Sequence, residues 1–152
     1  LLYWKDKEFQ NLLKYYISNG HKVTIETNAS LDIQINEIYQ KQIIFSMSVK
    51  LSNSLEKLEK RVNKDTLFEI LNKTNDSYFK FVINSTFVNN ALEEISNILE
   101  NLPKTEVFLM PMGDTNNELN QNSQDVINMA IINGYKFSDR LHIRVWDNKR
   151  GV

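Results

Sequence analysis

The chain has 152 residues, of which 41% are hydrophobic and 24% charged, with four glycines and two prolines. These values are typical of one ordinary globular domain, residues 1–152, and exclude collagen-like, low-complexity and strongly disordered chains. The formal net charge is -1, and lysine and arginine are scattered along the chain, which gives no basic face for nucleic acid. The apolar runs are too short to cross a bilayer, and the absence of cysteine excludes disulfides and thiolate metal sites within this chain.

Apolar periodicity predicts helices and strands that alternate along the chain. The predicted helices cover residues 9–17, 54–73, 88–101 and 123–133, and the predicted strands cover 22–27, 43–49, 78–83, 105–110 and 141–146. Asn-Gly pairs at residues 19–20 and 133–134 end two of the helices. Ile33, Ile35 and Ile38 lie in a connecting segment for which no structure is predicted. Residues 114–122 are predicted to form a polar loop.

Single helices between the strands indicate right-handed βαβ units and a mostly parallel sheet. The pattern fits one α/β layer system, either part of a (β/α) barrel or an open doubly wound sheet. In both architectures ligands bind at the carboxyl ends of the strands, so the residues at those ends are the candidates for chemistry.

The first two strand ends carry polar side chains. Glu26, Thr27 and Asn28 offer a carboxylate, a hydroxyl and an amide to a polar heterocycle or a ribose. Turn and helix-cap hydrogen bonds would use the same groups, and that alternative stays open. Lys50 follows Ser48 by two residues and could bind a carboxylate as a compact cation, or could be a solvated lysine.

The next two strand ends are more apolar. Lys80 lies between two phenylalanines and faces opposite to both, which predicts a structural role or an ion pair. Residues 110–113, Met-Pro-Met-Gly, are predicted to form a turn with free backbone carbonyls that would suit a purine ring. The alternative is that these residues simply stop the strand.

The last predicted strand places His142 and Arg144 on one face. A histidine on a polar strand face is more often solvated than catalytic. No Ser/His/Asp arrangement, metal-ligand spacing or glycine-rich phosphate loop is present in the sequence. The residues by themselves therefore indicate an α/β domain with candidate ligands at its strand ends.

Five segments, taken together and in order, resemble 7-carboxy-7-deazaguanine synthase, a radical S-adenosylmethionine (SAM) enzyme. They are residues 26–28 (Glu-Thr-Asn), 79–82 (Phe-Lys-Phe-Val), 107–113 (Val-Phe-Leu-Met-Pro-Met-Gly), 133–143 and 146–152. The chain departs from the family's pattern at Ala29, where the family has glycine. It also departs at Val49, where the family has proline, and losing that proline loosens the local backbone. The family's CxxxCxxC loop would lie before Leu1, and because Leu1 is not a methionine the N-terminus is expected to be missing.

The resemblance implies a partial (β/α) barrel of mostly parallel strands, truncated at its N-terminal strands. It implies that the intact protein is a cytoplasmic lyase of queuosine biosynthesis that converts 6-carboxy-5,6,7,8-tetrahydropterin to 7-carboxy-7-deazaguanine. The cofactors implied are SAM, a [4Fe–4S] cluster and Mg²⁺. Without the cluster segment, this chain alone is expected to bind no iron and to be inactive. A homodimer is also expected, with residues 22–27 as an edge strand that pairs with another chain or is covered by its own helix.

The resemblance also implies roles for the strand-end residues. SAM would be bound by Thr27, Asn28, Ser48, Lys50, Met110, Pro111 and Met112, of which the last three would frame the adenine. The pterin substrate would be bound by Glu26, Arg140, His142 and the terminal carboxylate of Val152. No residue of this chain is expected to be a metal ligand or to act as a catalytic group itself.

Two other functions are compatible with the same strand-end groups. One is a different radical SAM protein, such as an activating enzyme for a glycyl-radical partner, although the ending at residues 140–142 and 149–152 argues against it. The other is a non-catalytic α/β binding module that never held a cluster. Three cysteines at CxxxCxxC spacing upstream of Leu1 would favour the enzyme over the module.

Overall fold

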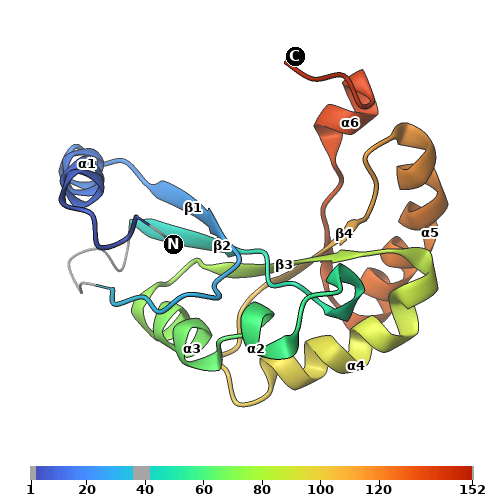
Figure 1. Cartoon of the computed structure of the whole chain (residues 1–152), viewed down its shortest axis with the longest axis horizontal. Coiled ribbons are helices and arrows are strands. Elements are labelled where there is room, and N and C mark those ends of the chain that lie inside the picture. The colour runs from blue at the N-terminus through green and yellow to red at the C-terminus, as the bar shows by residue number, and fades with distance from the viewer. Residues whose placement is uncertain (1–2, 36–41, 152) are drawn as a thin grey trace.

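A computed structural model describes residues 3–35 and 42–151 of the chain (Figure 1). Its helices are α1 (Lys7–Ser18), α2 (Leu58–Arg61), α3 (Lys64–Lys73), α4 (Val88–Leu99), α5 (Asn116–Asn133) and α6 (Leu141–Trp146). Its strands are β1 (Val23–Thr27), β2 (Ile43–Met47), β3 (Tyr78–Ile83), β4 (Val107–Pro111) and β5 (Lys136–Phe137). Ile38 and the predicted substrate ligand Val152 lie outside the described residues. Within the described ranges, no helix combines the length and the apolar character needed to span a membrane.

The five strands form one sheet in the order β1-β2-β3-β4-β5, and every neighbouring pair is parallel. A doubly wound sheet would reverse its strand order at a switch point, whereas a barrel adds each strand beside the previous one. The observed order therefore selects the barrel arrangement from the two that the sequence pattern allowed. Among the described residues β1 and β5 are the edge strands, so the sheet is open and the fold is a partial (β/α) barrel.

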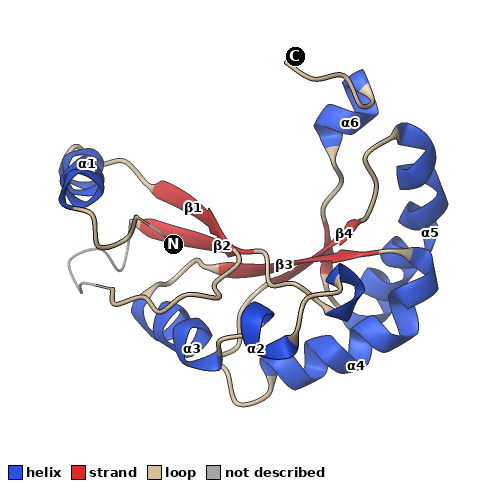
Figure 2. Ribbon diagram, viewed as in Figure 1, coloured by secondary structure: helices blue, strands red, loops and turns tan. Residues whose placement is uncertain are grey.

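The two faces of the sheet differ because successive side chains on a strand point to opposite sides. Figure 2 shows the helices α3 and α4 along one side of the sheet. The core holds fully buried apolar side chains from the central strands, namely Phe45, Phe79, Phe81, Ile83 and Leu109. The alternate residues of β3 and β4, which face the other way, are only partly buried. This second face, here called the inner face, is the one that remains accessible to a ligand.

The four longer strands agree with the predicted runs, with ends that differ by no more than two residues. The predicted helix over residues 54–73 is interrupted. Leu55 takes a left-handed backbone with φ 62°, and Val62 is extended between α2 and α3. The Asn63 side chain then accepts a hydrogen bond from the backbone N–H of Thr66 and starts α3 as an N-cap.

The helix α5 begins at Asn116, inside the segment predicted to be a polar loop. Thr115 caps it by accepting from the Glu118 N–H at 3.2 Å, while the Glu118 carboxylate accepts from the Asp114 N–H at 2.7 Å. This is a variant of the capping box, in which Thr and Glu three residues apart satisfy free N–H groups at a helix start. The prediction of a loop here is wrong, and the Thr-x-x-Glu spacing was the overlooked signal in the sequence for the true start.

The predicted last strand over residues 141–146 is wrong, because these residues form α6. Only Ile143 of this helix is buried, whereas Leu141 and Val145 are exposed, so their alternation with polar residues did not reflect a strand with one buried face. Arg144 instead donates hydrogen bonds to Asp139, Asn120 and Ser123. The fifth strand of the sheet is the short β5, which pairs with β4.

Two phenylalanines provide a test of this core. Phe81 is fully buried and stacks on Phe79 with ring centroids 5.6 Å apart, whereas Phe68 on α3 is 51% exposed. Phe81→Ala is expected to lower the free energy of unfolding by about 3–5 kcal/mol, since it leaves a cavity in a packed core. Phe68→Ala is expected to cost less than about 1 kcal/mol. Urea denaturation of both variants measures this, and equal losses would contradict the assignment of Phe81 to the buried core.

Candidate functional site

A hollow of about 350 Å³ lies at the carboxyl ends of β2, β3 and β4, and is here called the strand-end pocket. This is the edge of a parallel sheet where α/β barrels bind their ligands. The residues that line it are Ser48, Val49, Lys50, Leu51, Asn53, Ser54, Lys80, Val82, Met110, Met112 and Arg140. Five of the residues expected to bind SAM or substrate are therefore brought together, from segments far apart in the sequence.

Lys80 crosses the inner face to reach β1. Its ammonium donates to a Glu26 carboxylate oxygen at 3.0 Å, with the lysine side chain 18% exposed and the glutamate 74% exposed. The register aligns Glu26 with Ser46 on β2, so the ion pair spans the intervening strand. The prediction of an ion pair for Lys80 is confirmed. Ser46 on β2 is fully buried, and its hydroxyl has no hydrogen-bond partner among the described residues.

The lining of the strand-end pocket is cationic. It contains Lys50, Lys80 and Arg140, and no aspartate or glutamate. The Arg140 guanidinium donates to the Gly113 carbonyl at 2.8 Å and lies 3.4 Å from the largely exposed carboxylate of Asp114. Three positive groups around one hollow favour a ligand that carries carboxylate groups.

The methionines Met110 and Met112 line the pocket, whereas Pro111 between them is buried. The expectation of free backbone carbonyls in this turn is wrong at two positions. The Met112 carbonyl accepts from the Asn122 side chain at 2.7 Å, and the Gly113 carbonyl accepts from Arg140. The two methionine side chains, and not these carbonyls, are what the turn presents to a ligand.

Thr27 and Asn28 are absent from the lining of the strand-end pocket. The Thr27 hydroxyl accepts from the Ala29 N–H at 3.0 Å, and the Asn28 side-chain oxygen accepts from the N–H and the hydroxyl of Ser30. These are the turn interactions that the sequence left open as an alternative. Ala29 has φ 54°, the left-handed region that favours glycine, and is buried. The structure therefore gives a backbone reason for a glycine at this position in related sequences.

His142 does not share a strand face with Arg144, because both lie on α6. The His142 side chain is exposed and is not part of the strand-end pocket, although Arg140, just before α6, is. Sequence reasoning also left out Asn53 and Ser54, which line the pocket from the turn after β2. The available signal was their position a few residues after Ser48 and Lys50, in the segment that follows β2.

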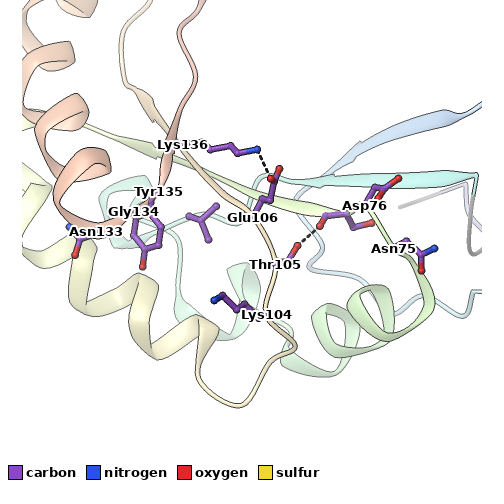
Figure 3. Close-up of a pocket in the computed structure, with 11 residues that line it drawn as sticks. Asn75, Asp76, Lys104, Thr105, Glu106, Asn133, Gly134, Tyr135 and Lys136 are labelled. Carbon is purple, nitrogen blue, oxygen red and sulfur yellow. Dashed lines mark hydrogen bonds and ion pairs between the residues drawn. The ribbon is translucent and has the colours of Figure 1, made fainter.

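A larger hollow of about 850 Å³ lies at the opposite edge of the sheet, before the amino ends of β3, β4 and β5 (Figure 3). Its charged groups are largely paired within the chain. Lys136 forms an ion pair with Glu106, and Asp76 pairs with Lys22 at 3.0 Å. Because parallel sheets bind ligands at their carboxyl edge, we assign the candidate site to the strand-end pocket in spite of its smaller volume.

The residues of this chain do not fit an iron–sulfur cluster. The chain has no cysteine and therefore no thiolate to bind iron. Among the residues that the structure describes, no group of three or more His, Asp or Glu side chains could hold a metal ion.

Comparison with known proteins confirms the resemblance drawn from the sequence, although no family model matches the chain. The 7-carboxy-7-deazaguanine synthase of Rhodopirellula baltica is 28% identical over 152 residues, which cover 96% of this chain and 59% of that protein. The synthase of Halobacterium salinarum is 26% identical over 90% of this chain and 59% of its own length. That of Pyrobaculum aerophilum is 31% identical over 77 residues, which cover 49% of this chain and 33% of its own.

A solved structure is similar in fold. The crystal structure of QueE from Escherichia coli matches with a TM-score of 0.54 and 18% identity, over 85% of this chain and 48% of that one. The likeness supports the partial barrel. The chain spans only about half the length of the proteins that it matches over most of its residues.

Replacement of Ala29 by glycine tests the backbone strain in the turn after β1, with Ala91 as the control position. Ala29→Gly relieves the φ of 54°, so we expect it to leave the free energy of unfolding unchanged or to raise it by up to about 1 kcal/mol. Ala91→Gly, in the interior of α4, removes an equally buried methyl group and is expected to cost about 1 kcal/mol or more. Thermal denaturation compares the two. A loss at residue 29 as large as that at residue 91 would contradict the strain.

Proposed function

Because the chain resembles 7-carboxy-7-deazaguanine synthases over nearly its whole length, we propose that it forms the reactant-binding part of such an enzyme. The observation that carries the proposal is the cationic strand-end pocket, with Lys50, Lys80 and Arg140 in its lining. Both reactants of that enzyme carry a carboxylate, SAM on its methionine part and 6-carboxy-5,6,7,8-tetrahydropterin on its ring. A lysine ammonium or an arginine guanidinium binds such a group through charge-assisted hydrogen bonds.

In this proposal the complete enzyme is a radical SAM lyase that forms 7-carboxy-7-deazaguanine from the tetrahydropterin, with SAM, a [4Fe–4S] cluster and Mg²⁺. The chain described here supplies no thiolate, so the cluster has to be held by cysteines outside these 152 residues. We expect the chain by itself to bind reactants without converting them.

The proposed roles follow the lining of the pocket, except for those of Glu26 and His142, which lie outside it. Ser48 and Lys50 bind the polar part of SAM, and Met110 and Met112 pack against its adenine. Arg140 binds the carboxylate of the pterin, with its guanidinium already oriented by the Gly113 carbonyl. Glu26, held by Lys80, accepts hydrogen bonds from amino groups of the pterin ring. His142, on the exposed surface of α6, is proposed as a further donor to the substrate.

Replacement of individual cations tests the proposal. Lys50→Met is expected to weaken SAM binding, and Arg140→Met the binding of 6-carboxypterin, a stable analogue of the substrate. Loss of a charge-assisted hydrogen bond of about 1.5–3 kcal/mol corresponds to a roughly ten- to hundredfold loss of affinity. Isothermal titration calorimetry on the chain measures both affinities.

The matched control for these variants is Lys14→Met, because Lys14 is exposed on α1, away from the pocket. It is expected to leave both affinities unchanged. Affinities that are the same in the Lys50→Met, Arg140→Met and unaltered chains would sink the proposal. Binding of SAM without any binding of the pterin would support a SAM-binding protein and contradict the proposed substrate.

We further propose that the chain forms a homodimer through the edge of the sheet that β1 forms. Among the described residues β1 pairs with β2 alone, so its other edge has unpaired N–H and C=O groups. Sedimentation velocity of the chain is expected to show a species of twice the monomer mass. A monomer at all concentrations would contradict the dimer but not the ligand assignment.

A further inference from the structure

Arg61, at the end of α2, is the one charged residue that is buried within the described part of the chain, with 7% of its surface exposed. Its guanidinium donates to the backbone carbonyl of Lys50 at 3.0 Å and to a Glu94 carboxylate oxygen at 3.2 Å. Its Nε atom has no partner among the described residues. The cost of burying a charge makes this position unusual in a core that could have used an apolar side chain.

Glu94, on α4, completes the arrangement from the other side. The carboxylate oxygen that pairs with Arg61 also accepts from the backbone N–H of Ser52 at 2.9 Å. The two charged side chains therefore hold the backbone on both sides of Leu51, which is itself buried. We call Arg61 and Glu94 together the clamp.

The clamp acts on the segment that enters the strand-end pocket. Ser48, Lys50 and Leu51 line that pocket, whereas Arg61 and Glu94 do not, and line a separate hollow beside α4. Any effect of the clamp on a ligand has to pass through the backbone of residues 50–52. The clamp also constrains this backbone next to Val49, whose own side chain leaves φ less restricted than a proline would.

We propose that Arg61 and Glu94 are positioning residues for Lys50. They fix the backbone after β2, so that the exposed side chain of Lys50 extends from a fixed point at the pocket before a ligand arrives. The role of Lys50 as a ligand-binding group rests on the proposed function, whereas the hold of the clamp on residues 50–52 does not. Such preorganisation raises affinity because less motion is lost on binding.

Amide hydrogen exchange tests the clamp without a ligand. Arg61→Met and Glu94→Met are expected to speed exchange at the Ser52 amide at least about tenfold, because local opening then needs fewer broken contacts. Glu94→Gln keeps an oxygen that can accept from Ser52, and its exchange is expected to stay close to that of the unaltered chain. Asp76→Asn, which breaks an ion pair with both side chains at least half exposed, serves as the matched control.

Unchanged exchange at Ser52 in the two methionine variants would overturn the proposal. An equal increase in the exchange rate at Ser52 and throughout the sheet would also contradict the proposal, because it would indicate a loss of global stability. If Arg61→Met does not fold, Glu94→Met and its rescue by Glu94→Gln decide the question.

A double-mutant cycle shows whether the clamp acts through Lys50. Arg61→Met is expected to weaken SAM binding roughly tenfold, in the range seen when outer-shell partners of a binding group are removed. In the Lys50→Met background the same change is expected to cost less than about twofold, since the group that it positions is gone. Full additivity would overturn the positioning role. If the unaltered chain binds no SAM, the proposed function fails, and exchange at Ser52 still decides whether the clamp exists.

Discussion

The parallel pairing of strands in chain order is the constraint on which the rest of the structure depends. It brings the carboxyl ends of β2, β3 and β4 to one edge, although the chain between them runs through several helices. The alternation of side chains then divides each strand between a buried core and an inner face. A lysine between two core phenylalanines is tolerated only because this alternation turns it toward the inner face, where Glu26 is its partner.

The distribution of charge is one reason to choose this edge of the sheet as the candidate site. The lining of the strand-end pocket has three cations and no carboxylate, although Lys80 and Arg140 have ion-pair partners outside it, whereas the lining of the larger hollow contains both acidic and basic side chains. Volume alone would select the opposite edge. The clamp of Arg61 and Glu94 adds a largely buried ion pair, whose further hydrogen bonds go to the backbone C=O of Lys50 and the backbone N–H of Ser52. Such a pair contributes little to the net free energy of unfolding. We therefore assign it a positioning role for the backbone beside Lys50.

The sequence predicted those features that depend on local patterning. The four longer strands were predicted correctly because short apolar or alternating runs of this length are needed to pack a parallel sheet, and β2 is buried at nearly every position. The same rule failed at residues 141–146, where Leu141 and Val145 alternate with polar residues but are exposed on a helix. The start of α5 was missed because residues 114–122 lack an apolar period, although Thr115 and Glu118 carried a capping signal.

Features that depend on register could not be predicted in this way. That Lys80 would form an ion pair followed from its position, but the choice of Glu26, 54 residues earlier, depends on how β1, β2 and β3 align. The contact of Arg61 with the Lys50 carbonyl likewise requires the short helix α2 and the break at Val62. Of the residues that the resemblance to the synthases grouped together, the structure places five in the lining of the pocket. It places Thr27 and Asn28 in the turn after β1 instead.

The most direct test of the account is an activity assay on a protein that contains this chain together with a CxxxCxxC segment. The protein would be reconstituted anaerobically with iron and sulfide, and supplied with SAM, Mg²⁺, a reductant and 6-carboxy-5,6,7,8-tetrahydropterin. The account predicts formation of 7-carboxy-7-deazaguanine, and a large loss of it when Lys50 or Arg140 is replaced. Cleavage of SAM with the pterin left unchanged, or no cluster at all, would contradict it.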